Sequence, residues 1–283
     1  MNSTYNATLD HLIDLALTED IGTGDLATSA IIPRATNGLA TLLAKADGMV
    51  SGLWVALRVF QHLDPEVSME IITPDATPIR RGETLATVSG RYDALLTGER
   101  VALNFLQRMS GIATLTRAYV EQLHGLNTRL LDTRKTVPGL RALDKRAVLD
   151  GGGANHRMGL FDLAMLKDNH IAMAGGITEA VAAARRRIPP YVRIEVETTT
   201  LEQVQEALEA GADIIMLDNM PIEAMRAAVQ LIDGRALTEA SGNVTPETVR
   251  DIARTGVDFV SAGAPTHSPR ALDISMRIEP IIH

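Results

Sequence analysis

The sequence predicts an α/β protein built from two parts. Residues 39–92 consist mostly of short strands and turns, and a long helical stretch over 93–125 follows them. From Arg129 onward, strands alternate with amphipathic helices. These strands are almost continuously apolar, which is typical of a parallel sheet buried on both faces. The second part is therefore expected to form a barrel-like parallel sheet covered by helices.

The first part begins with a helical pattern over residues 1–17, in which the apolar side chains share one face. A Gly-rich loop over 19–33 follows, with acidic residues typical of turns and helix caps. The segment 73–90 resembles the β modules of biotinyl and lipoyl carriers, but it lacks the lysine that a carrier needs at its hairpin tip. We therefore interpret it as a structural β domain. The long helix that follows has a candidate break at Ser110-Gly111.

Six strands are expected in the second part. They are "RLLD" (129–132), "DLAMLKDNH" (162–170), "YVRIEVE" (191–197), "ADIIMLDN" (212–219), "ALTEASG" (236–242) and "VDFVSAGA" (257–264). A complete barrel of this type has about eight strands, so the pattern alone leaves closure open. We place the first domain at residues 1–112 and the barrel domain at 113–267. The tail over 268–283 has no following helix and is expected to return to the first domain.

Composition narrows the class of function. The chain has 283 residues, 35 Asp and Glu against 27 Lys and Arg, and a net charge of −8, which argues against a nucleic-acid partner. It has no cysteine, which excludes disulfides, thiolate nucleophiles and Cys-ligated zinc. The N-terminus does not have the pattern of a secretory signal, and no run approaches the ~20 apolar residues of a membrane span. We expect a cytoplasmic protein without a membrane partner.

Polar or glycine residues stand at the end of nearly every predicted strand. They are Asp132 to Lys135, Lys167 to His170, Glu195 and Glu197, Asp218 and Asn219, Glu239 to Gly242, and Ser261 to Gly263. A single polar strand end is usually a cap or a turn. Since barrels of this kind carry their sites at the carboxyl ends of the strands, the repetition predicts a composite site there.

The cations in this set indicate an anionic small molecule. Arg134, Lys135 and Lys167 end strands, and His156-Arg157 follows a triple glycine. Arginine can hold a carboxylate with two hydrogen bonds, whereas lysine supplies a compact charge suited to phosphate. The helical cations Arg141, Lys145 and Arg146 are more simply interpreted as a solvated face. The set suits a ligand that carries several carboxylates or phosphates.

Two further features extend this site. "ASGNVTPE" and "SAGAP" follow the last two strands, and small residues before a helix give a phosphate access to free backbone N–H groups. Glu197 and Asp218 end neighbouring strands. They could bind a divalent metal such as Mg²⁺, accept ribose hydroxyls, stabilise a cationic sugar centre, or pair with the cations. The residues alone leave these alternatives open.

With these residues in hand, the sequence resembles the quinolinate phosphoribosyltransferase family. The matching segments are "GERVALNFLQRMSGIAT", "DTRKTVPGLRALDKRAVLDGGGANHRMGLFDLAMLKDNHI", "IEVET", "IIMLDNM", "SGNVTPE" and "TGVDFVSAGAPTHS". They run in family order over nearly the whole chain. The resemblance implies an N-terminal α/β sandwich domain, an incomplete α/β barrel of about six parallel strands, and a homodimer with shared sites. Assembly beyond the dimer is left open.

The resemblance also implies an activity and a role for each site residue. The reaction is transfer of ribose 5-phosphate from phosphoribosyl pyrophosphate to the ring nitrogen of quinolinate, with loss of pyrophosphate and carbon dioxide. Arg134, His156, Arg157 and Lys167 match residues that bind the quinolinate carboxylates, and Arg100 matches an arginine donated by the partner subunit. Lys135, Lys167, Glu197 and Asp218 match the catalytic contacts to phosphoribosyl pyrophosphate and its Mg²⁺, and Thr133 belongs to the same motif. Ser241, Gly242, Asn243, Ala262, Gly263 and Ala264 match the loops for the 5′-phosphate.

Three other hypotheses remain at this stage. A Schiff-base barrel enzyme would use Lys167 as its nucleophile. A related family associated with molybdenum transport shares the Thr-Arg-Lys motif, although "LKDNHI" resembles the quinolinate enzymes more closely. A binding or sensor protein on the same scaffold would hold the anions without releasing pyrophosphate.

Overall fold

The computed structural model describes residues 3–33 and 36–281. Met1 and Asn2 of the predicted first helix, and the last two residues of the tail, lie outside the described residues. The chain divides into two compact units. Unit 1 comprises Met1–Leu115, Pro138–Gly151 and Pro269–His283, and unit 2 comprises Thr116–Val137 and Gly152–Ser268.

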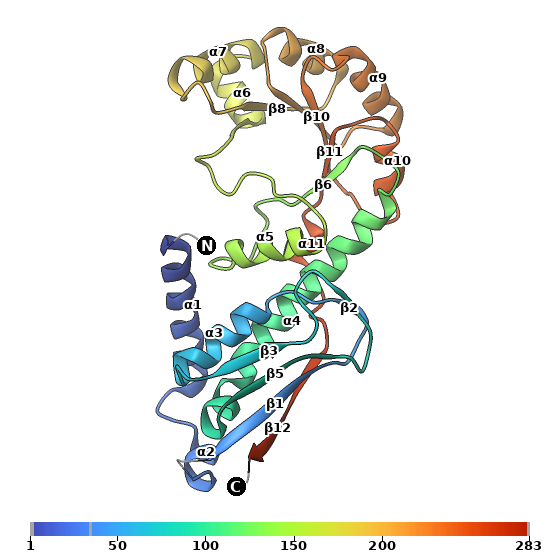
Figure 1. Cartoon of the computed structure of the whole chain (residues 1–283). Helices are drawn as coiled ribbons and strands as arrows, with labels where there is room; N and C mark the ends of the chain where they lie inside the picture. Colours follow the sequence, from blue (N-terminus) through green and yellow to red (C-terminus); the bar gives the residue numbers. More distant parts are fainter. Residues whose placement is uncertain (1–2, 34–35, 282–283) are drawn as a thin grey trace. The chain divides into compact units, whose positions relative to one another are not determined.

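Unit 1 is built on an antiparallel sheet with strand order β12-β1-β5-β3 (Figure 1). Its strands are β1 (Asn37–Ala44), β3 (Ser68–Ile71), β5 (Thr84–Arg91) and β12 (Ile274–Ile281), and β2 (Gly48–Met49) pairs separately with β4 (Pro78–Ile79). Its helices are α1 (Ser3–Ile21), α2 (Leu26–Ile31), α3 (Leu53–Leu63), α5 (Arg141–Asp150) and the first part of α4 (Tyr92–Gln122). The C-terminal strand β12 runs antiparallel to β1 along its whole length.

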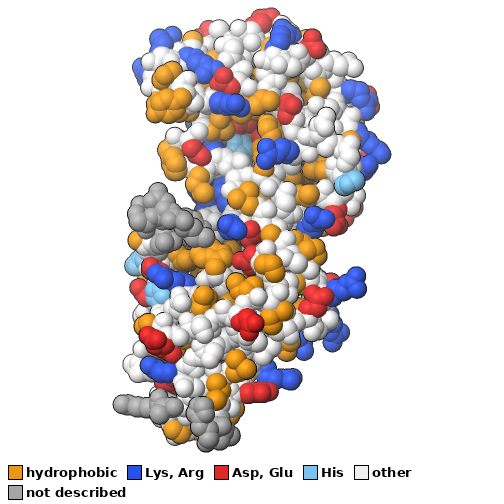
Figure 2. Space-filling model, viewed as in Figure 1, with side chains coloured by type: hydrophobic (Ala, Val, Ile, Leu, Met, Phe, Trp, Pro, Cys, Tyr) orange, Lys and Arg blue, Asp and Glu red, His pale blue; other side chains and the backbone are white. Residues whose placement is uncertain are grey.

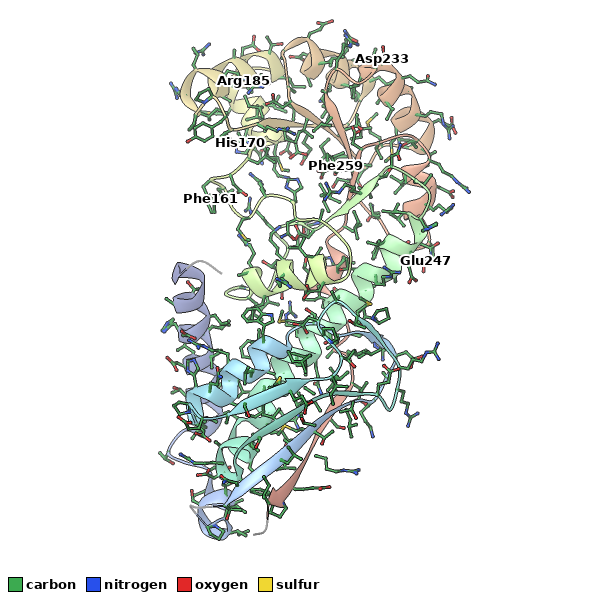
Figure 3. All side chains as sticks on the ribbon, viewed as in Figure 1. Phe161, His170, Arg185, Asp233, Glu247 and Phe259 are labelled. Atoms are coloured by element: carbon green, nitrogen blue, oxygen red, sulfur yellow. The ribbon has the colours of Figure 1, made fainter. Side chains whose placement is uncertain are left out.

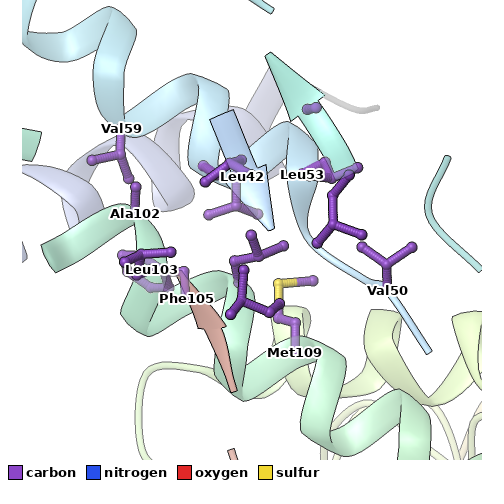
Figure 4. Close-up of a cluster of buried hydrophobic side chains, with 14 of the residues drawn as sticks. Leu42, Val50, Leu53, Val59, Ala102, Leu103, Phe105 and Met109 are labelled. Carbon is purple, nitrogen blue, oxygen red and sulfur yellow. The ribbon is translucent and has the colours of Figure 1, made fainter. Parts of the chain in front are cut away.

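The core of unit 1 follows from alternation in the strands and apolar faces on the helices. Every second residue of β1 is buried, as expected when one face of a sheet is covered. Leu42 of β1 packs in one cluster with Leu53 and Val59 of α3 and with Leu103 and Met109 of α4 (Figure 4). Helices on one face of an antiparallel sheet give the sandwich arrangement that the family resemblance implies.

Two details differ from the expectation for this region. Helix α4 continues through Ser110-Gly111 without a break. A side chain at Gly111 would collide with the backbone carbonyl of Arg270, so this glycine permits a close approach of the C-terminal segment. The structure also groups Pro138–Gly151 with unit 1, although this segment falls within the predicted barrel domain in the sequence. The reason is that Leu143, Ala147 and Val148 of α5 belong to the core of unit 1.

Unit 2 contains a six-stranded parallel sheet with strand order β6-β11-β10-β9-β8-β7. The strands are β6 (Arg129–Leu131), β7 (Ala164–Leu166), β8 (Ile194–Thr198), β9 (Ile214–Asp218), β10 (Leu237–Ser241) and β11 (Phe259–Ser261). The helices are α6 (Asp168–Ala174), α7 (Ile177–Arg187), α8 (Leu201–Glu209), α9 (Ile222–Ile232), α10 (Val249–Ala253) and α11 (Ala264–His267). The prediction of six parallel strands is confirmed.

The sheet of unit 2 is an open barrel. Among the described residues, β6 and β7 are its two edges and do not pair with each other. Helices α7 to α10 follow one another around the outside of the sheet (Figure 1). The structure corrects one predicted strand: β7 ends at Leu166, and Lys167 is the N-cap of the short helix α6. Lys167 nevertheless follows β7 directly, so it still lies at the carboxyl end of that strand.

No described helix has the length and apolar character that crossing a membrane requires. Acidic and basic side chains are interspersed over the visible face rather than gathered by sign (Figure 2).

Candidate active site

A pocket of about 630 Å³ lies within unit 2 at the carboxyl ends of the parallel strands. Its lining residues are Thr133, Arg134, Lys135, His156, Arg157, Met165, Lys167, Glu197, Met216, Asp218, Asn219, Glu239, Ser241, Gly242, Asn243 and Ser261. Eleven of these are residues predicted from the sequence as substrate-binding. Residues from all six strand ends or the segments after them line this one pocket.

The register of the sheet explains why these side chains face the same way. Glu197 pairs with Met216, and Met216 pairs with Glu239. Directly paired residues lie on the same face of a sheet, and so do residues two apart on one strand. Asp218 and Ser241 therefore share the face of Glu239. That single face lines the pocket.

The adjacent cations Arg134 and Lys135 diverge in the loop after β6. Burial lowers the pKa of the Arg157 guanidinium, and the nearby charge of Arg134 lowers it further. Lys135 instead passes Gly263, where an added Cβ would lie 2.9 Å from Cδ of Lys135. Thr266 Oγ1 donates to the carbonyl of Lys135 at 2.9 Å and fixes that backbone. The Arg134 side chain thus lies near Arg157, whereas the Lys135 side chain lies near Gly263 in the loop after β11.

Lys167 forms an ion pair across neighbouring strands. Its Nζ donates to Glu197 Oε2 at 2.7 Å, and the Lys167 side chain is 46% exposed against 17% for Glu197. The backbone N–H of Lys167 donates to Nδ1 of His170 at 3.0 Å. The lysine is therefore fixed at its backbone, while its ammonium group remains accessible at the pocket.

His156 lies against two buried carboxylates. Its Nε2 is 3.3 Å from Glu195 Oε2 and 3.3 Å from Glu239 Oε2, and the three side chains are almost completely buried. The backbone N–H of Arg157 donates to Nδ1 of His156 at 2.6 Å, and the backbone N–H of His156 donates to Asp132 Oδ1 at 2.8 Å. Ring and backbone of His156 are thus both fixed.

His156 and Glu195 bind protons more tightly than they would in water. Burial alone would lower the pKa of His156, but Glu195 and Glu239 outweigh it and raise the pKa to about 10. Burial also raises the pKa of Glu195. Nδ1 of His156 accepts the N–H of Arg157, so the ring proton of the imidazole is on Nε2, and the further proton described by the raised pKa values is held by the cluster of His156, Glu195 and Glu239 as a whole.

The loop after β10 has the backbone shape of a ligand-binding turn. Gly242 has φ +102°, and a side chain there would collide with the amide of Asn219. Asn219 and Asn243 both have positive φ, and Asn243 Nδ2 donates to Asn219 Oδ1 at 3.1 Å. Only glycine allows this close approach, so Ser241-Gly242-Asn243 is held against the end of β9 with its backbone open to the pocket.

Glu197 and Asp218 suit a partial metal site. Both line the pocket, and Asp218 Oδ2 accepts a hydrogen bond from Asn219 at 2.9 Å. Two carboxylates are too few for a full coordination shell, but Mg²⁺ commonly keeps waters and substrate phosphates as its other ligands. The two carboxylates are therefore compatible with a Mg²⁺ ion whose remaining ligands are waters and phosphate oxygens. His156, Glu195 and Glu239 also lie close enough to share an ion, but the imidazole already faces both carboxylates.

The remaining predicted residues do not line this pocket. Ala262 is buried and Ala264 begins α11, next to Gly263 and the Lys135 side chain. Arg100 is exposed on α4, in unit 1. The pocket in turn contains Met165, Met216, Asn219, Glu239 and Ser261, which were not assigned as site residues. Asn219, Glu239 and Ser261 stood in the strand-end pattern, and for Glu239 the spacing of two residues from Ser241 was an available signal.

Comparison with known proteins assigns the family. Residues 25–110 match the family described as the quinolinate phosphoribosyl transferase N-terminal domain, and residues 112–277 match its C-terminal domain. The chain belongs to the quinolinate phosphoribosyltransferase family.

Several members of the quinolinate phosphoribosyltransferase family are similar over nearly their full length. The chain is 48% identical to the chloroplastic carboxylating nicotinate-nucleotide pyrophosphorylase of Arabidopsis thaliana, over 98% of this chain and 84% of that protein. It is 46% identical to the probable carboxylating nicotinate-nucleotide pyrophosphorylase of a Synechocystis strain, over 95% of this chain and 92% of that protein. The crystal structure of NadC from Streptococcus pyogenes superposes with a TM-score of 0.94 at 42% identity, covering 97% of both chains.

Proposed function

We propose that this chain catalyses transfer of the phosphoribosyl group of phosphoribosyl pyrophosphate to the ring nitrogen of quinolinate, with release of pyrophosphate and carbon dioxide. The observation that best supports this proposal is that one pocket contains two separate regions suited to anions. Arg134 and Arg157 form the first, and Lys135 with the loop Ser241-Gly242-Asn243 forms the second. A dicarboxylate and a phosphorylated sugar would meet between them.

The first region suits quinolinate because its two carboxylates need several fixed cations. The Arg157 guanidinium donates to the carbonyl of Leu163 at 3.2 Å and contacts Met165 Sδ at 3.5 Å, so its direction is set by backbone and packing. Arg134 lies close enough to lower the Arg157 pKa. An anion with two negative charges relieves the repulsion between these cations, and positioning of this kind accounts for much of a transfer enzyme's rate.

The second region suits the 5′-phosphate. The backbone of Ser241-Gly242-Asn243 is fixed by the hydrogen bond between Asn243 and Asn219, and Lys135 supplies a cation beside Gly263. Backbone N–H groups and a lysine are the usual partners of a sugar phosphate at this edge of a barrel.

The transfer step requires charge placement more than a protein nucleophile. The ring nitrogen forms a bond to ribose C1 while the bond from C1 to the pyrophosphate oxygen breaks, and pyrophosphate leaves with that electron pair. Glu197 and Asp218 would stabilise the positive charge that develops on the ribose. These carboxylates would also hold Mg²⁺ together with pyrophosphate, and that ion supplies neutralisation of the leaving group's charge.

The decarboxylation step follows from the charge of the ring. Once alkylated, the ring nitrogen is cationic and can stabilise the electron pair left at C2 when carbon dioxide departs. A proton then joins C2 and gives nicotinate mononucleotide. Cations at the other carboxylate hold the ring during this step.

The observed ion pair of Lys167 does not favour a Schiff-base enzyme. Its Nζ donates to the Glu197 carboxylate at 2.7 Å, so the amine is held in an ion pair. A Schiff-base lysine needs an unprotonated amine.

Turnover of quinolinate and phosphoribosyl pyrophosphate with Mg²⁺ tests the proposal. We expect nicotinate mononucleotide, pyrophosphate and carbon dioxide in equal amounts. Binding of both substrates without pyrophosphate release would instead support a sensor protein. A borohydride-trapped adduct on Lys167 would support the Schiff-base alternative.

We also propose that the active enzyme is a homodimer in which Arg100 reaches the site of the partner subunit. Arg100 is exposed on α4. Leu160 and Phe161 are 73% and 78% exposed on the segment between Arg157 and β7 (Figure 3). Large exposed apolar side chains next to a binding pocket suit a surface that a second copy covers.

Mixing two inactive variants tests this arrangement. Arg100→Ala and Lys167→Ala damage different parts of a shared site. A mixed dimer would then contain one site with both residues intact, so remixing should restore up to roughly a quarter of the activity, as expected for random pairing in two-fold dimers. No recovery, with dimers confirmed by sedimentation, would contradict a donated Arg100.

A further inference from the structure

Two buried carboxylates, Glu239 in the lining of the pocket and Glu195 on the same face of the sheet, have no role in the chemistry described above. Glu195 is the second residue of β8 and Glu239 the third residue of β10, and both are essentially inaccessible to solvent. Among the described residues, neither carboxylate oxygen of Glu195 accepts a hydrogen bond within normal geometry. Oε1 of Glu239 is in the same situation.

Two buried carboxylates without hydrogen-bond partners in the described part of the chain for most of their oxygens lower the stability of the folded state. Burying a charged carboxylate is unfavourable by several kcal/mol, and replacing buried ionic groups by packed apolar residues often stabilises a protein. Strand β9 lies between the two glutamates and carries Ile214 and Met216 at the paired positions. Apolar side chains are therefore compatible with this layer of the sheet, and the fold alone does not explain the glutamates.

The distances indicate that the two glutamates hold the His156 ring in place. Both carboxylates approach the same atom, Nε2 of His156, from opposite sides of β9. The other ring nitrogen, Nδ1, accepts the backbone N–H of Arg157. The ring therefore links the sheet to the backbone of the residue whose guanidinium faces Arg134 in the pocket.

We propose that Glu195 and Glu239 are positioning residues that fix the His156 ring and, through it, the Arg157 backbone in the geometry that binds the carboxylates of the substrate. The identity of that substrate rests on the proposed function. The phosphate-binding region is fixed by other contacts, namely the hydrogen bond between Asn243 and Asn219 and the approach of Lys135 to Gly263. The two glutamates should therefore control quinolinate binding and leave phosphoribosyl pyrophosphate binding unchanged.

Steady-state kinetics of Glu239→Ala, Glu239→Gln, Glu195→Ala and Glu195→Gln provide the first test. We expect each alanine variant to raise KM for quinolinate by about tenfold or more, since small displacements of a binding group have effects of this size. Glutamine keeps the side-chain shape and a polar oxygen beside Nε2, so the glutamine variants should be affected less. KM for phosphoribosyl pyrophosphate should stay within about twofold. Glu223→Gln, an exposed residue of α9, is the control for loss of one charge and should match wild type.

A spectroscopic test is independent of activity. In protein labelled with ¹⁵N-histidine, the His156 signals, assigned by their loss in His156→Gln, should show a proton on Nε2 and an acceptor Nδ1. In the alanine variants this single tautomer should give way to an averaged signal, with partial recovery in the glutamine variants.

The outcomes separate the two proposals. Unchanged His156 signals in both alanine variants, or a parallel rise of both KM values, would overturn the positioning role. Absence of quinolinate turnover in wild type would overturn the proposed function, and the histidine signals would still decide the positioning role. If the alanine variants fail to fold, the glutamine variants carry the same comparison.

Discussion

Nζ of Lys167 lies 2.7 Å from Oε2 of Glu197, so a cation of the predicted carboxylate region touches an anion of the predicted ribose region. The two residues follow and end neighbouring parallel strands, β7 and β8. The pair therefore marks the boundary at which the two substrates would meet. An ion pair that is partly exposed contributes little to stability, which leaves both groups available for ligands.

Replacing Lys167 by Ala should lower turnover by orders of magnitude and leave the fold intact. The variant loses a cation for the carboxylates and also frees Glu197, which then faces the incoming anions without a counter-ion. Turnover and thermal melting should be measured together, with Arg226→Ala on α9 as an exposed ion-pair control. Near-normal quinolinate turnover in Lys167→Ala would contradict the assignment of the site.

Arg157→Ala and Lys135→Ala should affect different substrates. Loss of Arg157 removes the guanidinium beside Arg134, so KM for quinolinate should rise and turnover should fall by at least a hundredfold, as expected when a positioning group is lost. Loss of Lys135 removes the cation beside Gly263, so KM for phosphoribosyl pyrophosphate should rise instead. If both variants change KM for quinolinate and KM for phosphoribosyl pyrophosphate by the same factors, the two anion regions are not separate.

Much of the barrel could be predicted because its sequence signals are local. All six parallel strands were found from apolar runs, and the polar residues that end them came together in one pocket. Helix α6 was not predicted because "KDNH" follows the apolar run directly, with no turn residue between them, while its helical form depends on the cap contact between Lys167 and His170.

Other features depend on contacts between distant segments, which periodicity does not reveal. Helix α5 follows β6 in the chain, yet its apolar face packs in the core of unit 1. Glu239 lies two residues before the predicted Ser241, but its importance follows only from the approach of His156, 83 positions earlier in the sequence. The role of Arg100 rests on family resemblance, since an exposed arginine on a helix has no local signature.

The stability of unit 2 should fall as the pH rises above about 6.5. His156 has an ordinary pKa of 6.5, and its two carboxylate neighbours raise this to about 10 in the fold. The folded state therefore binds this proton more tightly than the unfolded chain does. The stability that this tighter proton binding contributes is fully present below pH 6.5 and is lost as the pH approaches 10.

Thermal melting between pH 6.5 and pH 10 measures this dependence. Wild type should lose more stability over the interval than the double variant Glu195→Gln with Glu239→Gln, which lacks the charges that raise the His156 pKa. Equal losses in the two proteins would show that the cluster does not retain a proton at neutral pH.

A buried ion pair in unit 1 predicts the largest effect on stability. Arg108 of α4 donates to both carboxylate oxygens of Asp144, at 2.9 and 2.7 Å, and the Asp144 side chain is completely buried. Arg108→Ala removes this partner of a buried charge, which should destabilise the protein by about 3–5 kcal/mol. Arg117→Ala is the control on the same helix, because its exposed pair with Glu121 should contribute less than about 1 kcal/mol.

Removing both partners distinguishes the cost of a stranded charge from the loss of the contact itself. The double variant Arg108→Ala with Asp144→Ala leaves no stranded carboxylate, so it should recover much of the stability lost in Arg108→Ala. Urea unfolding of the two variants and wild type measures this difference. A double variant that is less stable than Arg108→Ala would mean that Asp144 stabilises α5 through contacts other than its pair with Arg108.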